Sequence, residues 1–392
     1  MKNNYDAIMP RLIFGEDSSK NVGSIFHSME NVHSIMAIFD EGIKNAGISD
    51  PIIQSLKDDG FVVEEFGDIE RDPSTDTIER AADIAKEKNV DAFVAIGGGG
   101  VIDVTKCVAM LSTNPGRTLD YELGVGKPIP NKCKPWVGIP TTSGTGSEVT
   151  CLSIVTNTKI HRKVCVKDVV KLRATAAILD PKLAVGLPKG LTATTGMDAL
   201  SHAVEGYLVP IANEYSDIFC EAAIKKIVQY LPTAVSNGAD LKARGEMMKA
   251  ASYASIGFAN STLQIGHSIA HALGESVHVP HGMACAWGLP FAIRRCGEVV
   301  SFKRLQRLAG LLGIDVCGLE RTELIHKCEE VVLSMNEELN VPTPKEYGIG
   351  SPDEMEKAYK ACVTMEQPML QAGGVKITDD SVHDYFEEMW RW

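Results

Sequence analysis

The first half of the chain alternates short apolar runs with longer stretches of mixed polarity. Apolar runs at 35–39, 60–63, 91–96 and 136–139 have the length and composition of buried β-strands. Between them lie stretches rich in Ala, Glu, Lys and Arg, such as 74–88, which are typical of helices. This alternation predicts an α/β domain whose mostly parallel sheet carries helices on both faces.

The pattern changes near residue 185. Beyond it, strand-like runs nearly vanish, and long patterns rich in Ala, Glu and Lys take over, as at 216–230 and 321–339. We therefore expect two domains, an α/β domain over 1–185 and an all-helical domain over 186–392.

Composition narrows the class of protein. With 44% apolar residues in 392, the chain can build sizeable cores, and its net charge of -12 argues against binding nucleic acid. Because no apolar run reaches about 18 residues and the start lacks a signal-peptide pattern, we expect a cytoplasmic protein that does not enter membranes. The 10 Cys contain no CxxC pair, so they are expected to be buried apolar residues or free thiols rather than a zinc site.

Two segments carry candidate metal ligands. Asp198 and His202 lie four apart, which on a helix places them on one face, although such a pair is more often a solvated surface pair. The segment 266–282 holds four of the 10 His among apolar residues, where imidazoles need partners. A shared metal ion satisfies that need; separately hydrogen-bonded core histidines are the alternative.

Spacing constrains how this second segment folds. On one helix, His267 and His281 would lie about 21 Å apart, too far for one ion. The chain must therefore fold back between them, and Gly274 and Pro280 are suitable breakers. His271 lies one turn from His267, so it is better placed as a proton relay than as a ligand.

A glycine turn and a hydroxyl-rich loop are candidates for nucleotide binding. Residues 97–100 are four glycines between an apolar strand and a helical pattern, an arrangement that suits a phosphate, although a tight turn without a ligand looks the same. The loop 140–148 follows the next strand and carries five hydroxyl side chains. Both should open at the carboxyl edge of one sheet. Asp40 ends an earlier strand, where it would bind ribose and favour NAD over NADP, or simply cap the next helix.

Five ordered blocks resemble the iron-containing alcohol dehydrogenases, a metal-dependent family, over nearly the whole chain. They are GGGGVIDVTK at 97–106, IPTTSGTGSEVT at 139–150, ILDPKL at 178–183, TATTGMDALSHAVEGY at 192–207 and GHSIAHALGESVHVPHGMACA at 266–286.

The resemblance implies a catalytic ion and NAD(H), with the helical domain binding the metal. The ion is usually Fe²⁺, and the same ligand types accept Zn²⁺ or Mn²⁺. The implied ligands are Asp198, His202, His267 and His281. The implied dinucleotide contacts are Asp40, Gly97, Gly98, Gly99, Asp103, Thr141, Thr142, Thr145 and Lys163. His271 matches a catalytic pocket histidine beside the metal, and Phe258 matches an aromatic residue that lines the substrate pocket.

Several residues depart from the family pattern. Asp72 stands where an Asn commonly precedes Pro, which adds a negative charge near the expected cofactor site. Gln264 and Gly266 replace the usual residues before His267, and we expect the Gln264 amide to enter the substrate pocket and favour a polar substrate. The segment 373–376 replaces a commoner Asn-Pro-Arg type.

The implied reaction is hydride transfer between the nicotinamide and a carbonyl carbon, in a cleft between the two domains, with the metal polarising the oxygen. We expect a small alcohol or aldehyde substrate, reduction of the aldehyde in cells, and a homo-oligomer. Glycerol dehydrogenase-like polyol oxidation and a dehydroquinate synthase-like lyase share the architecture and remain alternatives, as does a metal-binding protein without catalysis.

Overall fold

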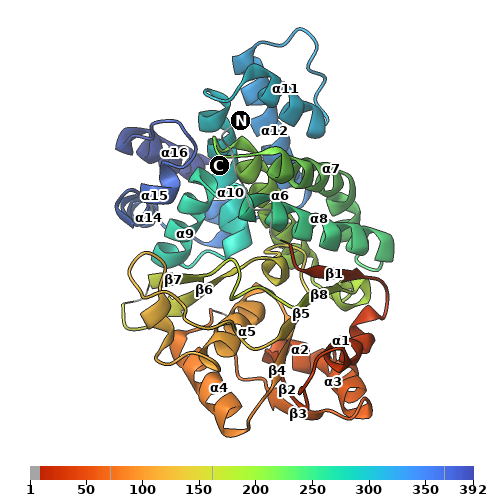
Figure 1. Ribbon diagram of the computed structural model, residues 1–392. Helices are drawn as coiled ribbons and strands as arrows, with labels where there is room; N and C mark the ends of the chain where they lie inside the picture. The colour runs from red at the N-terminus through yellow and green to blue at the C-terminus, as the bar shows by residue number, and fades with distance from the viewer. Residues whose placement is uncertain (1–8, 71, 161, 366) are drawn as a thin grey trace. The chain divides into compact units, whose positions relative to one another are not determined.

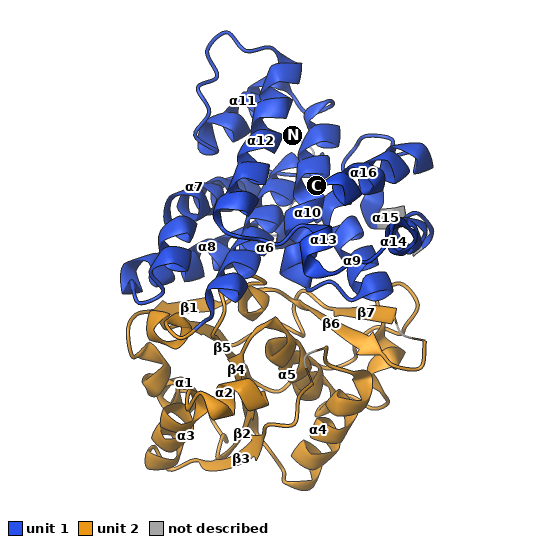
Figure 2. Cartoon of the chain, turned by 180° about the vertical axis from the view of Figure 1, so that it is seen from behind, with its two compact units in different colours: residues 1–7, 187–392 blue, residues 8–186 orange. Residues whose placement is uncertain are grey.

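The computed structural model describes residues 9–70, 72–160, 162–365 and 367–392, and the chain forms two compact units (Figure 1, Figure 2). The first unit along the chain, drawn in orange and labelled unit 2 in Figure 2, ends at Gly186. The second, drawn in blue and labelled unit 1, begins at Leu187, beside the boundary expected near residue 185. The roles given to the two domains stay predictions.

The first unit is built on a six-stranded sheet in which every pair of neighbouring strands is parallel. In spatial order the strands are β1 (Arg11–Phe14), β8 (Ala176–Leu179), β5 (Trp136–Pro140), β4 (Ala92–Gly97), β2 (Ser34–Phe39) and β3 (Val62–Phe66). The helices are α1 (Gly23–His27), α2 (Glu41–Asn45), α3 (Ser49–Asp58), α4 (Thr75–Glu87) and α5 (Gly99–Leu111). The α/β class and the four apolar runs are confirmed as a sheet, whereas β1 and β8 were not predicted as strands.

Side chains of the central strands alternate between two separate cores. Along β2, Ile35, Ala37 and Phe39 belong to one buried cluster, whereas Met36 and Ile38 belong to another. Because successive residues of a strand point to opposite faces, a continuous apolar run requires cover on both faces. Helices α4 and α5 contribute residues to the second cluster, and α1 and α3 to the first, so the sheet has helices on both faces.

Two further strands form an antiparallel hairpin outside this sheet. They are β6 (Leu152–Asn157) and β7 (Arg162–Lys167). Buried and half-buried positions alternate along β6, as expected for a strand covered on one side. This hairpin was not predicted from the sequence, because its short amphipathic strands lack the apolar runs by which the other strands were recognised. Among its described residues, the unit also has four 3₁₀ turns, namely η1 (Ser18–Asn21), η2 (Thr118–Tyr121), η3 (Ser147–Val149) and η4 (Pro181–Ala184).

Among the described residues of the second unit, helices joined by loops are present and no strand occurs. Its helices are α6 (Lys189–Leu208), α7 (Glu214–Ser236), α8 (Leu241–Ala259), α9 (Ile265–Val277), α10 (His281–Gly297), α11 (Phe302–Leu311), α12 (Arg321–Glu338), α13 (Pro344–Tyr347), α14 (Pro352–Met365), α15 (Gln367–Leu370) and α16 (Asp379–Arg391). Helix α6 is buried along most of its length and contacts α7, α8, α9 and α10 (Figure 1). Among the described residues, no helix combines the length and apolarity needed to cross a bilayer.

Candidate metal centre

The buried helix α6 presents the first pair of candidate ligands. Asp198 and His202 lie one turn apart on α6, and their side chains are almost fully buried. The distance from Asp198 Oδ1 to His202 Nδ1 is 3.8 Å. The pair is therefore a core feature, which excludes the interpretation as a solvated surface pair.

The turn between α9 and α10 brings the second pair together. Helix α9 ends at Val277, and His278 then adopts a left-handed conformation with φ of 57°. Helix α10 begins at His281, directly after Pro280. The chain folds back as expected, but Gly274 lies inside α9 and is not a breaker, because the reversal is made at His278.

Three imidazole nitrogens surround one carboxylate oxygen. From Asp198 Oδ1, His202 Nδ1 lies at 3.8 Å, His267 Nε2 at 3.7 Å and His281 Nε2 at 3.6 Å. These distances are too long for hydrogen bonds, and Asp198 Oδ1 is buried with no hydrogen-bond partner in the described part of the chain. Ligand atoms on a tetrahedron about 2.0–2.2 Å from an ion are about 3.3–3.6 Å apart. The donor types and spacing therefore fit a divalent metal ion.

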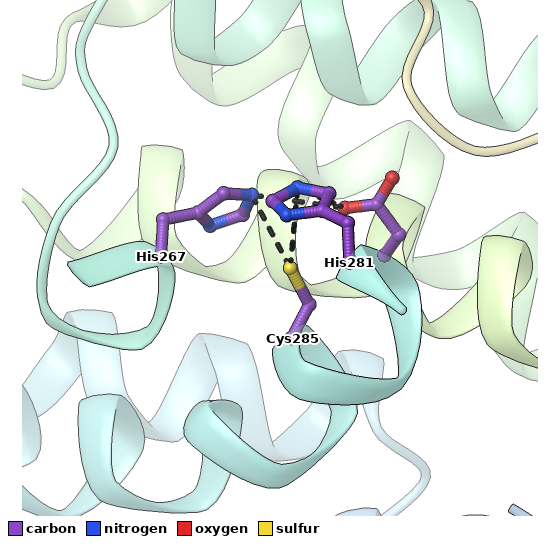
Figure 3. A group of neighbouring side chains, drawn as sticks. His267, His281 and Cys285 are labelled. Atoms are coloured by element: carbon purple, nitrogen blue, oxygen red, sulfur yellow. Dashed lines mark hydrogen bonds and ion pairs between the residues drawn. The ribbon is translucent and has the colours of Figure 1, made fainter. Parts of the chain in front are cut away.

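A thiol belongs to the same cluster. Cys285 Sγ lies 3.5 Å from His281 Nε2 and 3.6 Å from His267 Nε2. Figure 3 shows the two rings and the thiol converging from α9 and α10. Ligand atoms of Asp198, His267, His281 and Cys285 all lie within 4.8 Å of one another. From the sequence, this cysteine was expected only as a buried apolar residue or a free thiol, like the other nine.

A buried carboxylate orients one of the imidazoles. Glu205 is fully buried on α6, and its Oε1 lies 2.7 Å from His267 Nδ1. Its Oε2 accepts the backbone N–H groups of Gln264, at 3.0 Å, and His267, at 3.3 Å. A carboxylate at Nδ1 favours a ring proton on that nitrogen, so Nε2, which faces Asp198, is the atom that can ligate a cation. A Cβ at Gly266 would lie 2.6 Å from Glu205 Oε1, so the missing side chain there gives the carboxylate its room.

Burial and neighbouring charges shift the pKa values of the side chains in this cluster. Burial opposes ionisation of Asp198, but attraction to His202, His267 and His281 outweighs it and holds the pKa of Asp198 well below its usual range. Burial also opposes a charged His267 ring, yet the pKa of His267 is raised by Cys285, Glu205 and Asp198 together. Burial raises the pKa of the Cys285 thiol to about 12, so this group is neutral at neutral pH without a metal. The ionised carboxylate of Asp198 therefore supplies negative charge that a cation needs.

Two more side chains frame the cluster. His271 is partly exposed, and its ring centroid lies 5.7 Å from that of His281 and 6.3 Å from that of His267. Phe258 stacks on His202 with the ring centroids 4.7 Å apart. His271 therefore lies beside the candidate ligands and in reach of solvent, as a proton relay requires, and its catalytic role stays a prediction.

In the first unit, the glycine turn and the hydroxyl-rich loop lie side by side. Gly97 at the end of β4 is paired in register with Pro140 at the end of β5, and Thr141 N donates to Gly97 O at 3.1 Å. The two loops therefore open at the same sheet edge, as expected. A Cβ at Gly99 would lie 2.6 Å from Thr145 Oγ1. The glycine there permits close approach of the two loops, with α5 beginning at the turn.

The carboxylate of Asp103 is already engaged by the protein. Its Oδ1 accepts hydrogen bonds from Lys106 Nζ at 3.1 Å and Ser147 Oγ at 2.5 Å, and its Oδ2 accepts from Ile154 N at 2.9 Å. Lys106 is fully buried and also donates to Thr150 Oγ1 at 3.0 Å. This network connects α5 to the loop after β5, so Asp103 stabilises the conformation of that loop. Direct contact of Asp103 with a dinucleotide stays a prediction.

The remaining predicted contacts are placed as follows. Asp40 caps α2 by accepting the backbone N–H of Ile43 at 2.9 Å, as the alternative interpretation expects, so ribose binding stays a prediction. Lys163 Nζ lies 2.9 Å from Asp72 Oδ1, so the unusual acid forms an ion pair with a predicted cofactor-binding lysine. Thr142 is half-buried at the loop after β5.

The expectation for Gln264 is wrong. Its side chain is fully buried, with Nε2 donating to Glu205 O at 3.1 Å and Oε1 accepting from Cys296 Sγ at 2.7 Å. The amide supports the start of α9 and is enclosed by protein, so it does not line a pocket open to a substrate. A Cβ at Gly373 would lie 2.4 Å from Gln264 Oε1, so this pair of departures from the family pattern packs together.

Comparison with known proteins agrees with this geometry. The model of "Iron-containing alcohol dehydrogenase" matches residues 10–181, and that of "Fe-containing alcohol dehydrogenase family, C-terminal" matches residues 192–390. The chain is 33% identical over 338 residues to an NAD-dependent methanol dehydrogenase from Bacillus methanolicus, covering 86% of this chain and 87% of the relative.

Two solved structures share the fold along nearly the whole chain. A 1,3-propanediol oxidoreductase has a TM-score of 0.92 at 26% identity, with 99% of this chain and 100% of the other covered. Sulfoacetaldehyde reductase from Bifidobacterium kashiwanohense, solved with NAD+, has a TM-score of 0.88 at 26% identity, with 99% of both chains covered. The name of the matched family gives iron, and the two relatives named with a cofactor here carry NAD, in agreement with the NAD(H) and Fe²⁺ expected from the sequence. The chain therefore belongs to the iron-containing alcohol dehydrogenase family and is an oxidoreductase of alcohols and aldehydes.

Proposed function

We propose that this enzyme depends on NAD(H) and a divalent metal, and reduces a short aldehyde or ketone to its alcohol. The observation that carries the proposal is the convergence of three imidazole nitrogens on one buried, unsatisfied carboxylate oxygen, at 3.6–3.8 Å. Because the Gln264 amide is enclosed by protein, it gives no preference for a polar substrate. Cytoplasmic location and assembly into a homo-oligomer stay predictions from the sequence.

Asp198, His202, His267 and His281 would hold the ion. Their oxygen and nitrogen donors suit Fe²⁺, and they also accept Zn²⁺ or Mn²⁺. When bound, the ion polarises the substrate oxygen as a Lewis acid, and NADH supplies the hydride to the carbonyl carbon.

Residues of the chain itself position a metal ligand and supply a proton to the product. Through Nδ1, Glu205 holds His267 in the tautomer whose Nε2 is free to ligate. A ring nitrogen of His271 delivers a proton to the new alcohol oxygen and recovers one from solvent, which its partial exposure allows. Phe258, packed against His202, keeps that side of the cluster dry.

For the dinucleotide, support comes from the paired loops at the sheet edge. The turn at 97–99 begins α5, whose N-terminal N–H groups suit the pyrophosphate. Thr141, Thr142 and Thr145 supply donors beside it, and Lys163 adds a positive charge. The carboxylate of Asp40 accepts from ribose hydroxyls and repels a 2′-phosphate, which favours NADH over NADPH.

Metal-free protein reloaded with Fe²⁺ under argon, or with Zn²⁺, tests the proposal against a panel of short aldehydes with NADH. We expect NADH to be consumed in proportion to alcohol formed, whereas a lyase shows no net change. His267→Ala should lose both bound metal and turnover, while the exposed His326→Ala should keep both. A His267→Ala protein with full metal content and full rate would overturn the ligand assignment.

A further inference from the structure

Lys106 on α5 carries a fully buried positive charge that the proposed hydride and proton transfers do not use. Its Nζ is surrounded by four oxygen atoms, which are Asp103 Oδ1 at 3.1 Å, Ser147 Oγ at 2.6 Å, Thr150 Oγ1 at 3.0 Å and Leu152 O at 2.5 Å. An ammonium group has only three N–H bonds, so its hydrogen-bonding capacity is fully used. This side chain therefore occupies a site built for a buried cation.

The four oxygen atoms come from three segments that carry or flank the predicted dinucleotide contacts. Asp103 lies on α5, which begins at the glycine turn. Ser147 and Thr150 lie on η3 and directly after it, at the end of the hydroxyl-rich loop. Leu152 begins β6, the first strand of the hairpin that packs on α5 (Figure 1). The ammonium group therefore joins the turn, the loop and the hairpin at one point.

Through Ser147, the ammonium group acts on a predicted cofactor contact in the loop. The backbone N–H of Ser147 donates to Thr145 Oγ1 at 3.2 Å. Thr145 in turn lies against the glycine turn, since a Cβ at Gly99 would be 2.6 Å from its Oγ1. Without the anchor at Ser147, Thr145 would be free to move away from the start of α5, where the pyrophosphate is expected.

Through Leu152, the same group acts on the hairpin. Strand β6 is not part of the six-stranded sheet, so its position depends on contacts with α5 such as this one. Thr156 on β6 is paired in register with Lys163 on β7, and Lys163 Nζ donates to Thr156 Oγ1 at 3.0 Å. The distance of the Lys163 charge from the glycine turn therefore depends on how β6 is held against α5.

Stability alone gives little reason for a charge at this place. Apolar residues of similar volume often make a core as stable as a buried ion pair does. Directional hydrogen bonds add something that apolar contacts do not, because they fix the spacing of the segments that they join.

We propose that Lys106 is a positioning residue of the dinucleotide site, which fixes the spacing of the glycine turn, Thr145 and Lys163 before NAD(H) binds. Lys106 is enclosed by protein, so it acts through these segments and not by contact with the cofactor. The inference rests on the proposed function, because it requires NAD(H) at these loops. A site arranged in advance binds more tightly, since no ordering of its loops opposes binding.

The test compares the full-chain variant Lys106→Met with the matched control Lys134→Met. Lys134 is a half-buried lysine of the same unit, and its Nζ donates to Val90 O near the amino ends of β4 and β5, at the opposite edge of the sheet. In fluorescence titration of folded protein, Lys106→Met should bind NADH at least about tenfold more weakly than wild type, and Lys134→Met within about twofold of it.

Kinetics and metal binding separate positioning from a general disturbance. In Lys106→Met, KM for NADH should rise by the same factor as Kd. At saturating NADH, KM for the aldehyde should stay at the wild-type value, as should the affinity for Zn²⁺ in chelator competition. Zn²⁺ affinity that falls together with NADH affinity would contradict the proposal, because it would indicate a disturbance of the whole protein.

The remaining outcomes are equally decisive. Wild-type NADH affinity in folded Lys106→Met would overturn the role of Lys106 and leave the proposed function intact. Absence of NADH binding by the wild-type protein would overturn both. Should Lys106→Met fail to fold, Ser147→Ala replaces it, because it separates the loop from the ammonium group but keeps the pair with Asp103. We expect this variant to bind NADH about three- to tenfold more weakly, and unchanged affinity would refute the inference.

Discussion

Replacing Glu205 by Gln isolates the orientation of one ligand with little change in volume. The carboxylate accepts three hydrogen bonds, from His267 Nδ1 at 2.7 Å and from the backbone N–H groups of Gln264 and His267. A carboxamide has one oxygen, so its NH₂ group must face either the ring nitrogen or the two backbone donors.

Both orientations are costly. If the NH₂ group faces the backbone donors, two buried N–H groups lose their acceptor, which costs about 1–3 kcal/mol each in free energy of unfolding. If it faces the ring, His267 must accept at Nδ1 and carry its proton on Nε2, which then points at Asp198 and blocks the ion. We expect metal affinity to fall about 10–100-fold, equivalent to about 1.4–2.7 kcal/mol.

Two assays test this prediction. Chelator competition on the folded protein measures metal affinity, and urea titration of the metal-free protein measures the free energy of unfolding. Glu329→Gln is the matched control, because this buried carboxylate accepts from Arg294 Nε at 2.6 Å without being part of the metal cluster. It should lose stability but keep its affinity for metal. Wild-type metal affinity in Glu205→Gln would refute the reasoning.

Three further outcomes are expected. Lys106→Met should lower the free energy of unfolding by about 3–5 kcal/mol in urea titration, because it strands a buried carboxylate; a loss below 1 kcal/mol would contradict this. Gly99→Ala should weaken NADH binding about tenfold by fluorescence titration, because its Cβ would press on the neighbouring loop, whereas Gly310→Ala, with open space around it, should not; equal affinities would exclude this role. Asp72→Asn should tighten NADH binding about two- to fivefold at low salt by releasing Lys163, and an unchanged affinity would remove that lysine from the cofactor site.

The fold was largely accessible from the sequence, because a parallel sheet covered on both faces requires continuous apolar runs. The strand expected at 60–63 begins at Val62, since Gly60 has φ of 90° and ends the preceding helix. The hairpin of β6 and β7 escaped, because one-sided burial leaves only a weak alternation of polarity.

The spacing of Asp and His residues along the chain predicted the helices that carry the candidate ligands, but not the residues that orient those ligands. Asp198, His202, His267 and His281 carry the side chains expected of metal ligands, so they could be chosen by type and distance along the chain. Spacing places Glu205 on the same face of α6 as Asp198 and His202, but its role depends on His267, which lies 62 positions later in the chain. Cys285 lies four residues after His281, and this spacing alone predicts that the two side chains share one face of a helix.

The contact between α9 and α10 has a consequence for how metal enters and leaves. A Cβ at Gly288 would lie 2.6 Å from Gly266 O, so the two backbones touch without side chains between them. No side chain lies at this contact, so none has to change its rotamer when a metal ion binds. The helices α9 and α10 therefore hold their imidazoles in place before any cation arrives. Metal binding is therefore separate from folding. An enzyme from which a chelator has removed the metal should stay folded and regain its full activity when iron is added back.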